Sequence, residues 1–300
     1  MTRQIIVIGA GAIGSTIGGM LSKKFDVLLV DKNKEHVQAI NSQGLVLNGQ
    51  VNETIKVKAS MKVEEIKEGT VIINTTKSFD AGSSMKNIKS LLKKDTIVLC
   101  LQNGLGVVEK VKSEVGGKVF GGVTYIGAVF EDNGKIFVAA LGKNLLESSE
   151  ETKIIAKEFS ETGLDFEASV DYKKVQWEKL AVNCIINPLT ALLGVVNKEV
   201  AADELKEIRK EIIEECRKIA EKEGVALDKA FIKAVPNRIR SFQSNRSSML
   251  QDLMRKRKTE IDFINGAVVR LGKKHGVETP VNKSLVDLIK FKESEYCKQI

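Results

Sequence analysis

The hydrophobic pattern of the chain changes near residue 168. Before that point, short runs rich in β-branched residues alternate with segments in which apolar residues recur every three or four positions. This alternation predicts βα units and therefore a doubly wound parallel sheet. Strands are predicted at 4–8, 27–30, 70–75, 96–101 and 119–122, with later strands at 136–140 and 165–169, and helices are predicted at 12–24, 35–43, 81–93 and 107–114.

After about residue 170 only the helical period remains. Apolar residues from Leu205 to Ile219 recur at steps of three and four, which predicts a helix with one buried face that ends at Gly224. Further helices are predicted at 173–193, 228–242 and 259–275, and a last one opens at Pro280 and runs to the end. The pattern thus predicts an α/β domain over residues 1–168, followed by an all-α helical domain over residues 169–300.

A glycine-rich turn follows the first predicted strand and opens the first predicted helix. Its residues are Gly9, Ala10, Gly11, Ala12, Ile13 and Gly14. In this context the first glycine permits a tight turn, the second lets the backbone approach a pyrophosphate, and the third packs the helix against the strand. Free N–H groups at the helix start favour the bound anion. The first domain is therefore predicted to be of the Rossmann type and to bind a dinucleotide through these six residues.

A carboxylate at the end of the second predicted strand bears on which dinucleotide is bound. Asp31 stands where a partner for the ribose hydroxyls is expected, and its charge would repel the 2′-phosphate of NADPH. Lys32 and Lys34 follow and could hold that phosphate, although exposed loop charges explain them equally well. The choice between NADH and NADPH stays open, and Asp31 favours NADH.

Two polar residues follow the next strands. Lys77 comes after strand 70–75, and Asn103 comes after strand 96–101. Ligands of open α/β sheets collect outside the carboxyl ends of the strands. Lys77 could therefore hold a cofactor phosphate or ribose, and Asn103 could contact both nicotinamide and substrate. A solvent-exposed lysine and a simple Asn-Gly turn are the alternatives.

A polar stripe marks the first helix of the second domain. Lys179, Asn183 and Asn187 recur every four residues, so they lie on one helix face, about 6 Å apart at each step. Nearly all residues between them are apolar, and buried polar groups need partners. The stripe therefore indicates a lined cleft rather than a solvent-facing surface. Pro188 is expected to bend the helix near Cys184 and to aim Asn187 and Asn197 at one point.

Ser248 and Glu260 form a second polar set. Ser248 offers a hydroxyl and neighbouring N–H groups to a substrate carboxylate, and Glu260 falls in the first turn of the predicted helix 259–275. The alternative makes Thr259 a helix cap and Glu260 a favourable first-turn charge.

Composition removes several classes of function. The charge of +8 comes from 47 Lys and Arg against 39 Asp and Glu, and most of the excess lies after residue 168. Aromatic residues make up only 5%, which disfavours nucleic-acid binding despite the basic run at 255–258. Four cysteines without a Cys-x-x-Cys pair and two histidines predict buried thiols and no metal centre. Without a long apolar run or signal segment, a cytoplasmic protein is expected.

Taken together, these motifs resemble the ketopantoate reductases, or 2-dehydropantoate 2-reductases. The resemblance spans nearly the whole chain and rests on segments 9–14, 102–106, 122–124, 179–191, 247–252 and 259–262. It implies reduction of 2-dehydropantoate to pantoate by NADH or NADPH, a step toward pantothenate and coenzyme A. Lys179 matches the catalytic lysine that protonates the ketone oxygen, and Glu260 matches its acidic partner near the cofactor. Substrate-binding positions are matched by Asn103, Asn183, Asn187, Asn197 and Ser248, and cofactor contacts by Lys77, Asn103 and Ala128.

Three departures from the family pattern limit this transfer. Asp80 stands where a glutamine is common, Lys256 replaces a frequent glycine, and Asp31 with Lys32 replaces an arginine typical of members that prefer the 2′-phosphate. A related two-domain dehydrogenase for another 2-keto or 3-hydroxy acid remains an alternative, as does a non-catalytic dinucleotide-binding redox sensor. Apolar faces expected on the later helices suggest a homodimer formed through the helical domain.

Overall fold

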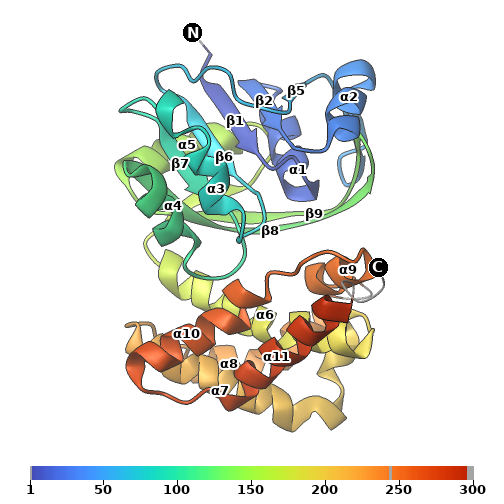
Figure 1. The fold of residues 1–300 in the computed structure, drawn as a ribbon, viewed down its shortest axis with the longest axis vertical. Coiled ribbons are helices and arrows are strands. Elements are labelled where there is room, and N and C mark those ends of the chain that lie inside the picture. Colours follow the sequence, from blue (N-terminus) through green and yellow to red (C-terminus); the bar gives the residue numbers. More distant parts are fainter. Residues whose placement is uncertain (1, 243–244, 296–300) are drawn as a thin grey trace. The chain divides into compact units, whose positions relative to one another are not determined.

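The computed structural model describes residues 2–242 and 245–295 and divides into two compact units. The first unit contains the chain up to Gln102 together with Val107–Tyr172, and the second contains Asn103–Gly106 and the chain from Lys173 onward. The short excursion at Asn103–Gly106 means that a loop of the sheet belongs, by its contacts, to the helical unit. The first unit is a mixed, mostly parallel sheet with helices, and the second is helical throughout its described part, which confirms the predicted fold class (Figure 1).

The sheet of the first unit has the strand order β4-β3-β9-β8-β7-β6-β1-β2-β5, with β10 also paired to β9. Its parallel part consists of β1 (Gln4–Ile8), β2 (Asp26–Val30), β5 (Lys58–Ser60), β6 (Val71–Asn74), β7 (Ile97–Cys100) and the start of β8 (Lys118–Asp132). Because β2 and β6 flank β1 on opposite sides, the connection direction reverses at β1. In open α/β sheets ligands bind outside the carboxyl ends of the strands at such a point.

The central strands carry apolar residues on both faces because helices cover them. Ile5, Ile6 and Val7 of β1 are fully buried, as are Ile72 and Ile73 of β6. The helices of this unit are α1 (Ala12–Leu21), α2 (Lys34–Gln43), α3 (Ala81–Lys86), η1 (Lys89–Leu91), α4 (Val107–Val115) and α5 (Glu150–Ser160). The single helix predicted at 81–93 is therefore wrong, since α3 ends at Lys86 and only a 3₁₀ turn follows.

The predicted strand set was incomplete at one end of the sheet. The sequence pattern missed β3 (Leu45–Gly49), β4 (Glu53–Ile55) and β5, because these strands are short and carry polar residues. It also underestimated β8 and β9 (Lys135–Glu147), which form a long antiparallel hairpin with three register shifts. Each shift breaks the alternation of buried and exposed residues on which strand prediction depends. The remaining strand, β10 (Phe166–Ser169), was predicted to within one residue.

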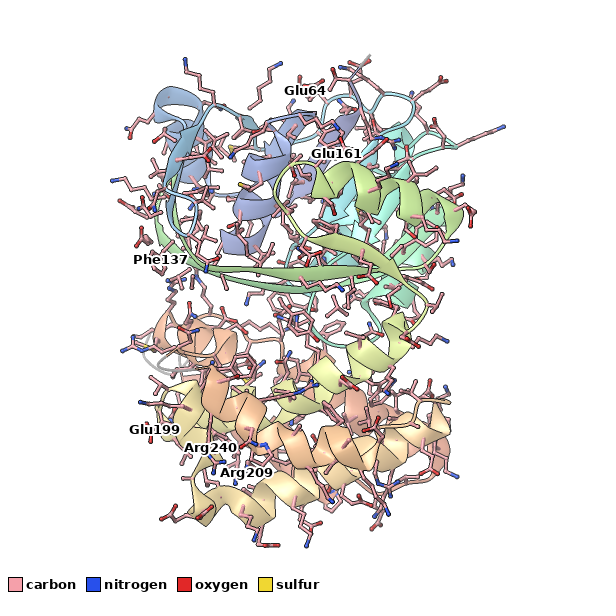
Figure 2. All side chains as sticks on the ribbon, turned by 180° about the vertical axis from the view of Figure 1, so that it is seen from behind. Glu64, Phe137, Glu161, Glu199, Arg209 and Arg240 are labelled. Carbon is pink, nitrogen blue, oxygen red and sulfur yellow. The ribbon has the colours of Figure 1, made fainter. Side chains whose placement is uncertain are left out.

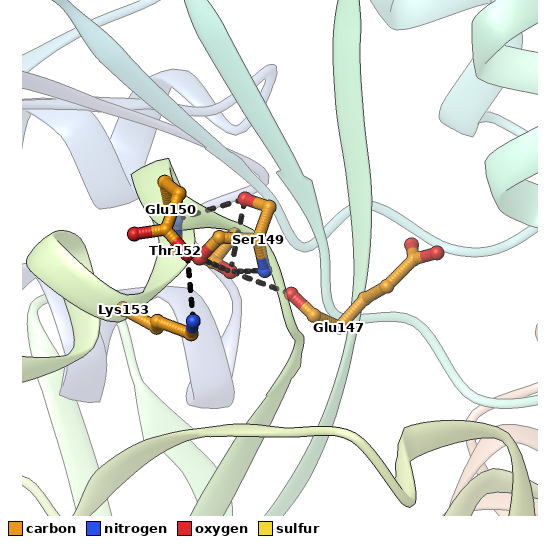
Figure 3. A network of polar contacts seen from close by, with 5 residues as sticks. All are labelled: Glu147, Ser149, Glu150, Thr152 and Lys153. Carbon is orange, nitrogen blue, oxygen red and sulfur yellow. Dashed lines mark hydrogen bonds and ion pairs between the residues drawn. The ribbon is translucent and has the colours of Figure 1, made fainter.

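Helix α5 was also missed, although its start has a local signal. Ser149 is the N-cap: its Oγ accepts from the backbone N–H of Thr152 (3.1 Å), and the Thr152 Oγ1 accepts from the backbone N–H of Ser149 (2.8 Å). The Thr152 hydroxyl also donates to the carbonyl of Glu147 (2.6 Å), and Lys153 pairs with Glu150 (Figure 3). A threonine thus fills the place that glutamate or glutamine usually takes in a capping box.

Helix α6 (Tyr172–Leu193) enters the second unit at its second residue, Lys173, and continues through Pro188. This unit also contains η2 (Asn197–Ala201), η3 (Asp203–Leu205), α7 (Lys206–Lys222), α8 (Lys229–Ser241), α9 (Ser248–Met254), η4 (Ile261–Phe263), α10 (Asn265–His275) and α11 (Pro280–Ser294). Proline occupies the first turn of α11, as predicted. The prediction that this helix runs to the end, and that Cys297 is buried, falls partly or wholly outside the described residues, whereas Cys100, Cys184 and Cys216 are buried free thiols.

The helix predicted at 259–275 is wrong in its first part. Residues Ile261–Phe263 form a 3₁₀ turn, and Ile264 leaves helical geometry with φ −100° and ψ −98° before α10 begins. The break frees the carbonyl of Phe263, which accepts from the backbone N–H of Leu105 (2.9 Å). A Cβ at Gly104 would collide with this same carbonyl, and Gly104 has φ +95°. A long-range contact, invisible to the periodicity, therefore decides where α10 starts.

No helix in the described part of the chain is long and apolar enough to cross a membrane.

A buried histidine, His36, supports the glycine turn through a chain of hydrogen bonds. The backbone N–H of Gly134, in the β8–β9 turn, donates to His36 Nδ1 (2.9 Å), so the proton of the neutral ring sits on Nε2 and is donated to Ser15 Oγ (3.2 Å). The Ser15 hydroxyl in turn donates to the carbonyl of Ala10 (2.7 Å). Burial lowers the pKa of His36, and the nearby charge of Asp31 opposes this only in part.

We expect the free energy of unfolding to fall as the pH drops below about 6.5, because the unfolded chain protonates His36 there while the folded chain resists it. The slope contributed by His36 is at most about 1.4 kcal/mol per pH unit, and it ends once the pH passes below the lowered folded pKa. Urea unfolding of the wild type and of His36→Gln between pH 7.5 and 5 measures this difference. The variant should be less stable at pH 7.5 and lose less on acidification; identical pH slopes would contradict the assignment.

Candidate active site

The glycine turn is held by strands on both sides of β1. The backbone N–H of Gly9 donates to Val30 of β2 (2.8 Å), and the N–H of Thr75, after β6, donates to Ile8 (2.8 Å). The Thr75 hydroxyl donates to the carbonyl of Gly9 (2.8 Å). Gly9 has φ +93°, and a Cβ there would lie 2.6 Å from the backbone nitrogen of Thr76. This turn therefore lies at the carboxyl ends of β1, β2 and β6. The connections between strands change direction across the sheet at this point.

The three glycines of the turn are required for different reasons. A Cβ at Gly14 would lie 2.2 Å from the carbonyl oxygen of Gly9, so this glycine serves the packing of α1 against the turn. A Cβ at Gly11, by contrast, would meet nothing within 4 Å. Gly11 is also the N-cap of α1, and no side chain caps that helix start. Within residues 2–242 and 245–295, the space beside the first N–H groups of this helix is therefore open at Gly11, which fits a dinucleotide pyrophosphate.

The next strand ends supply polar side chains around the turn. Asp31 follows β2, is half-buried, and its Oδ1 accepts from the backbone N–H of Asn33 (2.9 Å). Lys32 has a 92% exposed side chain, whose Nζ lies 3.6 Å from Asp80 Oδ2. Lys77 lies after β6 and is half-buried. Ala128 lies within β8, opposite Val138 of β9 and next to a register shift.

In the second unit, the polar stripe of α6 runs from partial exposure into the interior. Lys179 and Asn183 are half-buried, whereas Asn187 is only 5% exposed. Burial lowers the pKa of Lys179 to about 8, and the negative charge of Glu260 opposes this by favouring the ammonium form. A pKa lowered in this way makes the Lys179 ammonium a stronger acid than that of an exposed lysine.

Glu260 owes its position to the break before α10. It precedes η4, is 7% exposed, and its backbone carbonyl accepts from Phe263 (2.9 Å). The Asn103–Gly106 loop is attached to the same segment through the Leu105 to Phe263 bond. The structure thus brings Lys179, Glu260 and the loop of Asn103 into one unit, with the Glu260 charge acting on Lys179.

Asn197 and Ser248 lie on the segments that follow α6. Asn197 begins η2 and is 9% exposed, and its Oδ1 is buried without a hydrogen-bond partner in the described part of the chain. Arg209 of α7, labelled in Figure 2, holds this segment by donating to the carbonyls of Val200 and Ala202 (2.6 Å each). Ser248 is the first residue of α9 and is exposed. An orphaned buried amide oxygen fits a site that receives a hydroxyl or N–H donor from a ligand.

The sequence patterns missed two side chains that organise this unit. Ser247 is the N-cap of α9: its Oγ accepts from Leu250 N–H (3.1 Å) and lies 2.6 Å from the Thr190 hydroxyl of α6. Asn265 donates to the carbonyl of Cys184 (2.9 Å). Lys256, which stands where glycine is frequent in the family, adopts φ +53°, the left-handed conformation that glycine favours. The roles of Ser247 and Asn265 depend on tertiary contacts, which a local sequence pattern does not show.

An α/β unit with a glycine turn at its switch point, followed by a helical unit that carries Lys179 and Glu260, is the arrangement expected of a dinucleotide-dependent oxidoreductase. The profile of the family described as ketopantoate reductase PanE/ApbA matches residues 5–151, and the profile of its C-terminal domain matches residues 171–293. The chain belongs to the ketopantoate reductase family.

Individual relatives are similar in sequence to this chain over nearly its full length. A 2-dehydropantoate 2-reductase of Pyrococcus horikoshii is 36% identical, over 97% of this chain and 98% of the relative. One from Streptococcus pyogenes serotype M3 is 34% identical with the same coverage. Among solved structures, a PanE/ApbA family ketopantoate reductase from Ralstonia eutropha has a TM-score of 0.92 at 30% identity, covering 98% of this chain and 99% of the other. D-mandelate dehydrogenase in complex with NADH and anilino(oxo)acetate has a TM-score of 0.89 at 32% identity and the same coverage.

Proposed function

We propose that this protein reduces 2-dehydropantoate to pantoate with NADH or NADPH, a step toward pantothenate and coenzyme A. The observation that carries the proposal is the placement of Lys179 on one face of α6 with Asn183 and Asn187, in the same unit as the buried Glu260, whose charge acts on Lys179. Residues 1–168 would bind the dinucleotide, and residues 169–300 would bind the keto acid and supply the proton. Full-length relatives named 2-dehydropantoate 2-reductase support the substrate.

The residues of the chain account for the protein's part in this chemistry. The nicotinamide, when bound, supplies the hydride, and the ketone oxygen then gains negative charge. The Lys179 ammonium would stabilise that charge and donate its proton to the oxygen. Glu260 would keep Lys179 in place and favour its protonated form before the reaction.

Neutral amides suit the rest of an anionic, hydroxylated substrate. Asn103, Asn183, Asn187 and Asn197 can donate to carboxylate oxygens and accept from hydroxyls without adding negative charge. The unpartnered Oδ1 of Asn197 is an acceptor of the right kind for a substrate hydroxyl. Ser248, exposed at the start of α9, would contact the carboxylate.

On the cofactor side, the open space at Gly11 and the uncapped start of α1 support pyrophosphate binding by residues Gly9 to Gly14. Lys77 and Ala128 would make further contacts, as would Asn103 and Glu260. Asp31 supports NADH, because a carboxylate favours ribose hydroxyls and repels a 2′-phosphate. Asp80 adds to this preference, since it lies 3.6 Å from the lysine that could otherwise receive the phosphate.

Replacing Asp31 by serine is therefore expected to raise the KM for NADH about tenfold, through loss of charge-assisted hydrogen bonds, and to lower the KM for NADPH. Asp80→Gln should lower the KM for NADPH and leave the KM for NADH unchanged, because it removes the carboxylate next to Lys32. Initial rates with both cofactors for the two variants check this. An equal change in both KM values in Asp31→Ser would show that Asp31 does not distinguish the cofactors.

A second candidate is a dehydrogenase for another 2-keto acid, and the likeness to D-mandelate dehydrogenase favours it. The two candidates are separated by initial rates of NADH and NADPH oxidation with 2-dehydropantoate, phenylglyoxylate and smaller 2-keto acids. We expect the highest kcat/KM with 2-dehydropantoate. A higher value with phenylglyoxylate would replace the proposed substrate, and no turnover with any acid would leave the redox-sensor alternative.

A further inference from the structure

A proline inside α6 leaves one helical acceptor without its usual donor. In an α-helix the carbonyl of Cys184 would accept from the backbone N–H of residue 188, and Pro188 has none. Cys184 is fully buried, so water does not readily replace this donor. A buried carbonyl without a partner is costly, and another group in the protein must therefore supply the hydrogen bond.

Asn265, the first residue of α10, supplies it. Its Nδ2 donates to the carbonyl of Cys184 at 2.9 Å, and Asn265 is itself 0% exposed. The same Nδ2 donates to Asn282 Oδ1 at 2.9 Å. One side chain thus links α6, α10 and α11 in the interior of the helical unit.

The orientation of the Asn265 amide is imposed by its neighbours. Glu215 of α7 accepts from the backbone N–H groups of Val281 (2.8 Å) and Asn282 (2.9 Å) and from Asn282 Nδ2 (2.6 Å). Because the amide nitrogen of Asn282 faces this carboxylate, its oxygen must face Asn265. The nitrogen of Asn265 then donates to both Asn282 and Cys184.

This hydrogen bond connects the two segments that carry the proposed catalytic pair. Cys184 lies next to Asn183 and little more than one helical turn after Lys179, while Asn265 lies directly after the irregular segment that begins at Glu260. We propose that Asn265 is a positioning residue for the reaction: it uses the acceptor freed by Pro188 to fix Glu260 relative to Lys179. This inference rests on the proposed function of Lys179 as proton donor.

Asn265→Leu removes both hydrogen bonds and keeps the branched shape and the number of side-chain heavy atoms. We expect the unfolding temperature to fall by about 5 °C, because a buried acceptor loses its partner. We expect kcat for the keto acid to fall about 30-fold, because small misplacement of catalytic groups is costly, with cofactor affinity within about twofold. The upper midpoint of the pH profile of kcat should also move below its wild-type value, because the Glu260 charge no longer supports the Lys179 ammonium.

Pro188→Ala separates positioning from a purely structural role. Alanine restores a backbone N–H for Cys184 but no donor for Asn282, so the double variant Pro188→Ala/Asn265→Leu should recover part of the lost unfolding temperature but keep the low kcat. Asn144→Leu is the matched control, since Asn144 is also 0% exposed and donates to two carbonyls, those of Gly142 and Asp165 (3.2 Å each), in the first unit. It should lower the unfolding temperature and leave the pH profile of kcat unchanged.

Recovery of kcat together with the unfolding temperature in the double variant would overturn the positioning role, as would a normal pH profile in Asn265→Leu. Absence of any thermal coupling between positions 188 and 265 would overturn the pairing itself. If Asn265→Leu does not fold, the double variant and Asn265→Ser provide the same comparison. A wild type that turns over no 2-keto acid would refute the proposed function instead, and the thermal cycle would still test the pairing.

Discussion

Replacing Lys179 by alanine is expected to lower kcat for keto-acid reduction by about a thousandfold, within the range attributed to a positioned general acid. The cofactor should still bind, because the glycine turn and its supports lie in the other unit. Single-turnover rates and fluorescence titration with NADH measure the two effects separately. Lys179→Arg is the matched control: it keeps the positive charge but does not release a proton, so it should remain nearly as slow as alanine.

The pH dependence tests the same assignment in the wild type. Lys179 must be protonated to act as an acid, and its pKa is lowered to about 8. The value of kcat for reduction should therefore be level below pH 8 and fall about tenfold per unit above it. In the oxidation direction the neutral amine is required, so the rate should rise through the same region. A reduction rate that stays constant to pH 10, or an unimpaired Lys179→Ala, would remove Lys179 from the chemistry.

Gly11→Val should separate cofactor binding from folding. A Cβ at Gly11 meets nothing within 4 Å, and the backbone there has φ −68°, which any residue adopts, so the unfolding temperature should change little. The added side chain would occupy the space through which a pyrophosphate approaches the N–H groups of α1. We expect the affinity for NADH to fall at least about a hundredfold, an effect comparable to the loss of several charge-assisted hydrogen bonds.

Gly14→Val is the contrasting variant. Its Cβ would lie 2.2 Å from the carbonyl oxygen of Gly9, so α1 could not pack against the turn and the protein should lose stability as well as affinity. Calorimetry measures the unfolding temperature of each variant, and NADH titration measures its cofactor affinity. We expect Gly11→Val to lose affinity alone and Gly14→Val to lose both. If Gly11→Val retained full NADH affinity, the open space at the turn would not be the pyrophosphate site.

The structural setting of a candidate site residue was predicted correctly where that setting depends on local spacing in the chain. The glycine turn follows a strand predicted to its exact bounds, Gln4–Ile8, and opens α1 at its predicted first residue. Lys179, Asn183 and Asn187 fall on one predicted helix, because their spacing is a local property of α6. Glu260 stays a predicted site residue, but the setting predicted for it is wrong, since its segment leads into a 3₁₀ turn rather than a first helical turn.

By itself, the sequence determined the order of strands and helices wherever apolar residues repeat without interruption. It also determined the class of each unit and the motifs that identify the family. These features depend on contacts between near neighbours in the chain, which spacing records. Only the tertiary structure decided the length of the β8–β9 hairpin, the start of α10 and the partner of the Cys184 carbonyl. Each of these follows from a hydrogen bond or packing contact between distant segments, and a hydrophobic pattern carries no record of such a contact.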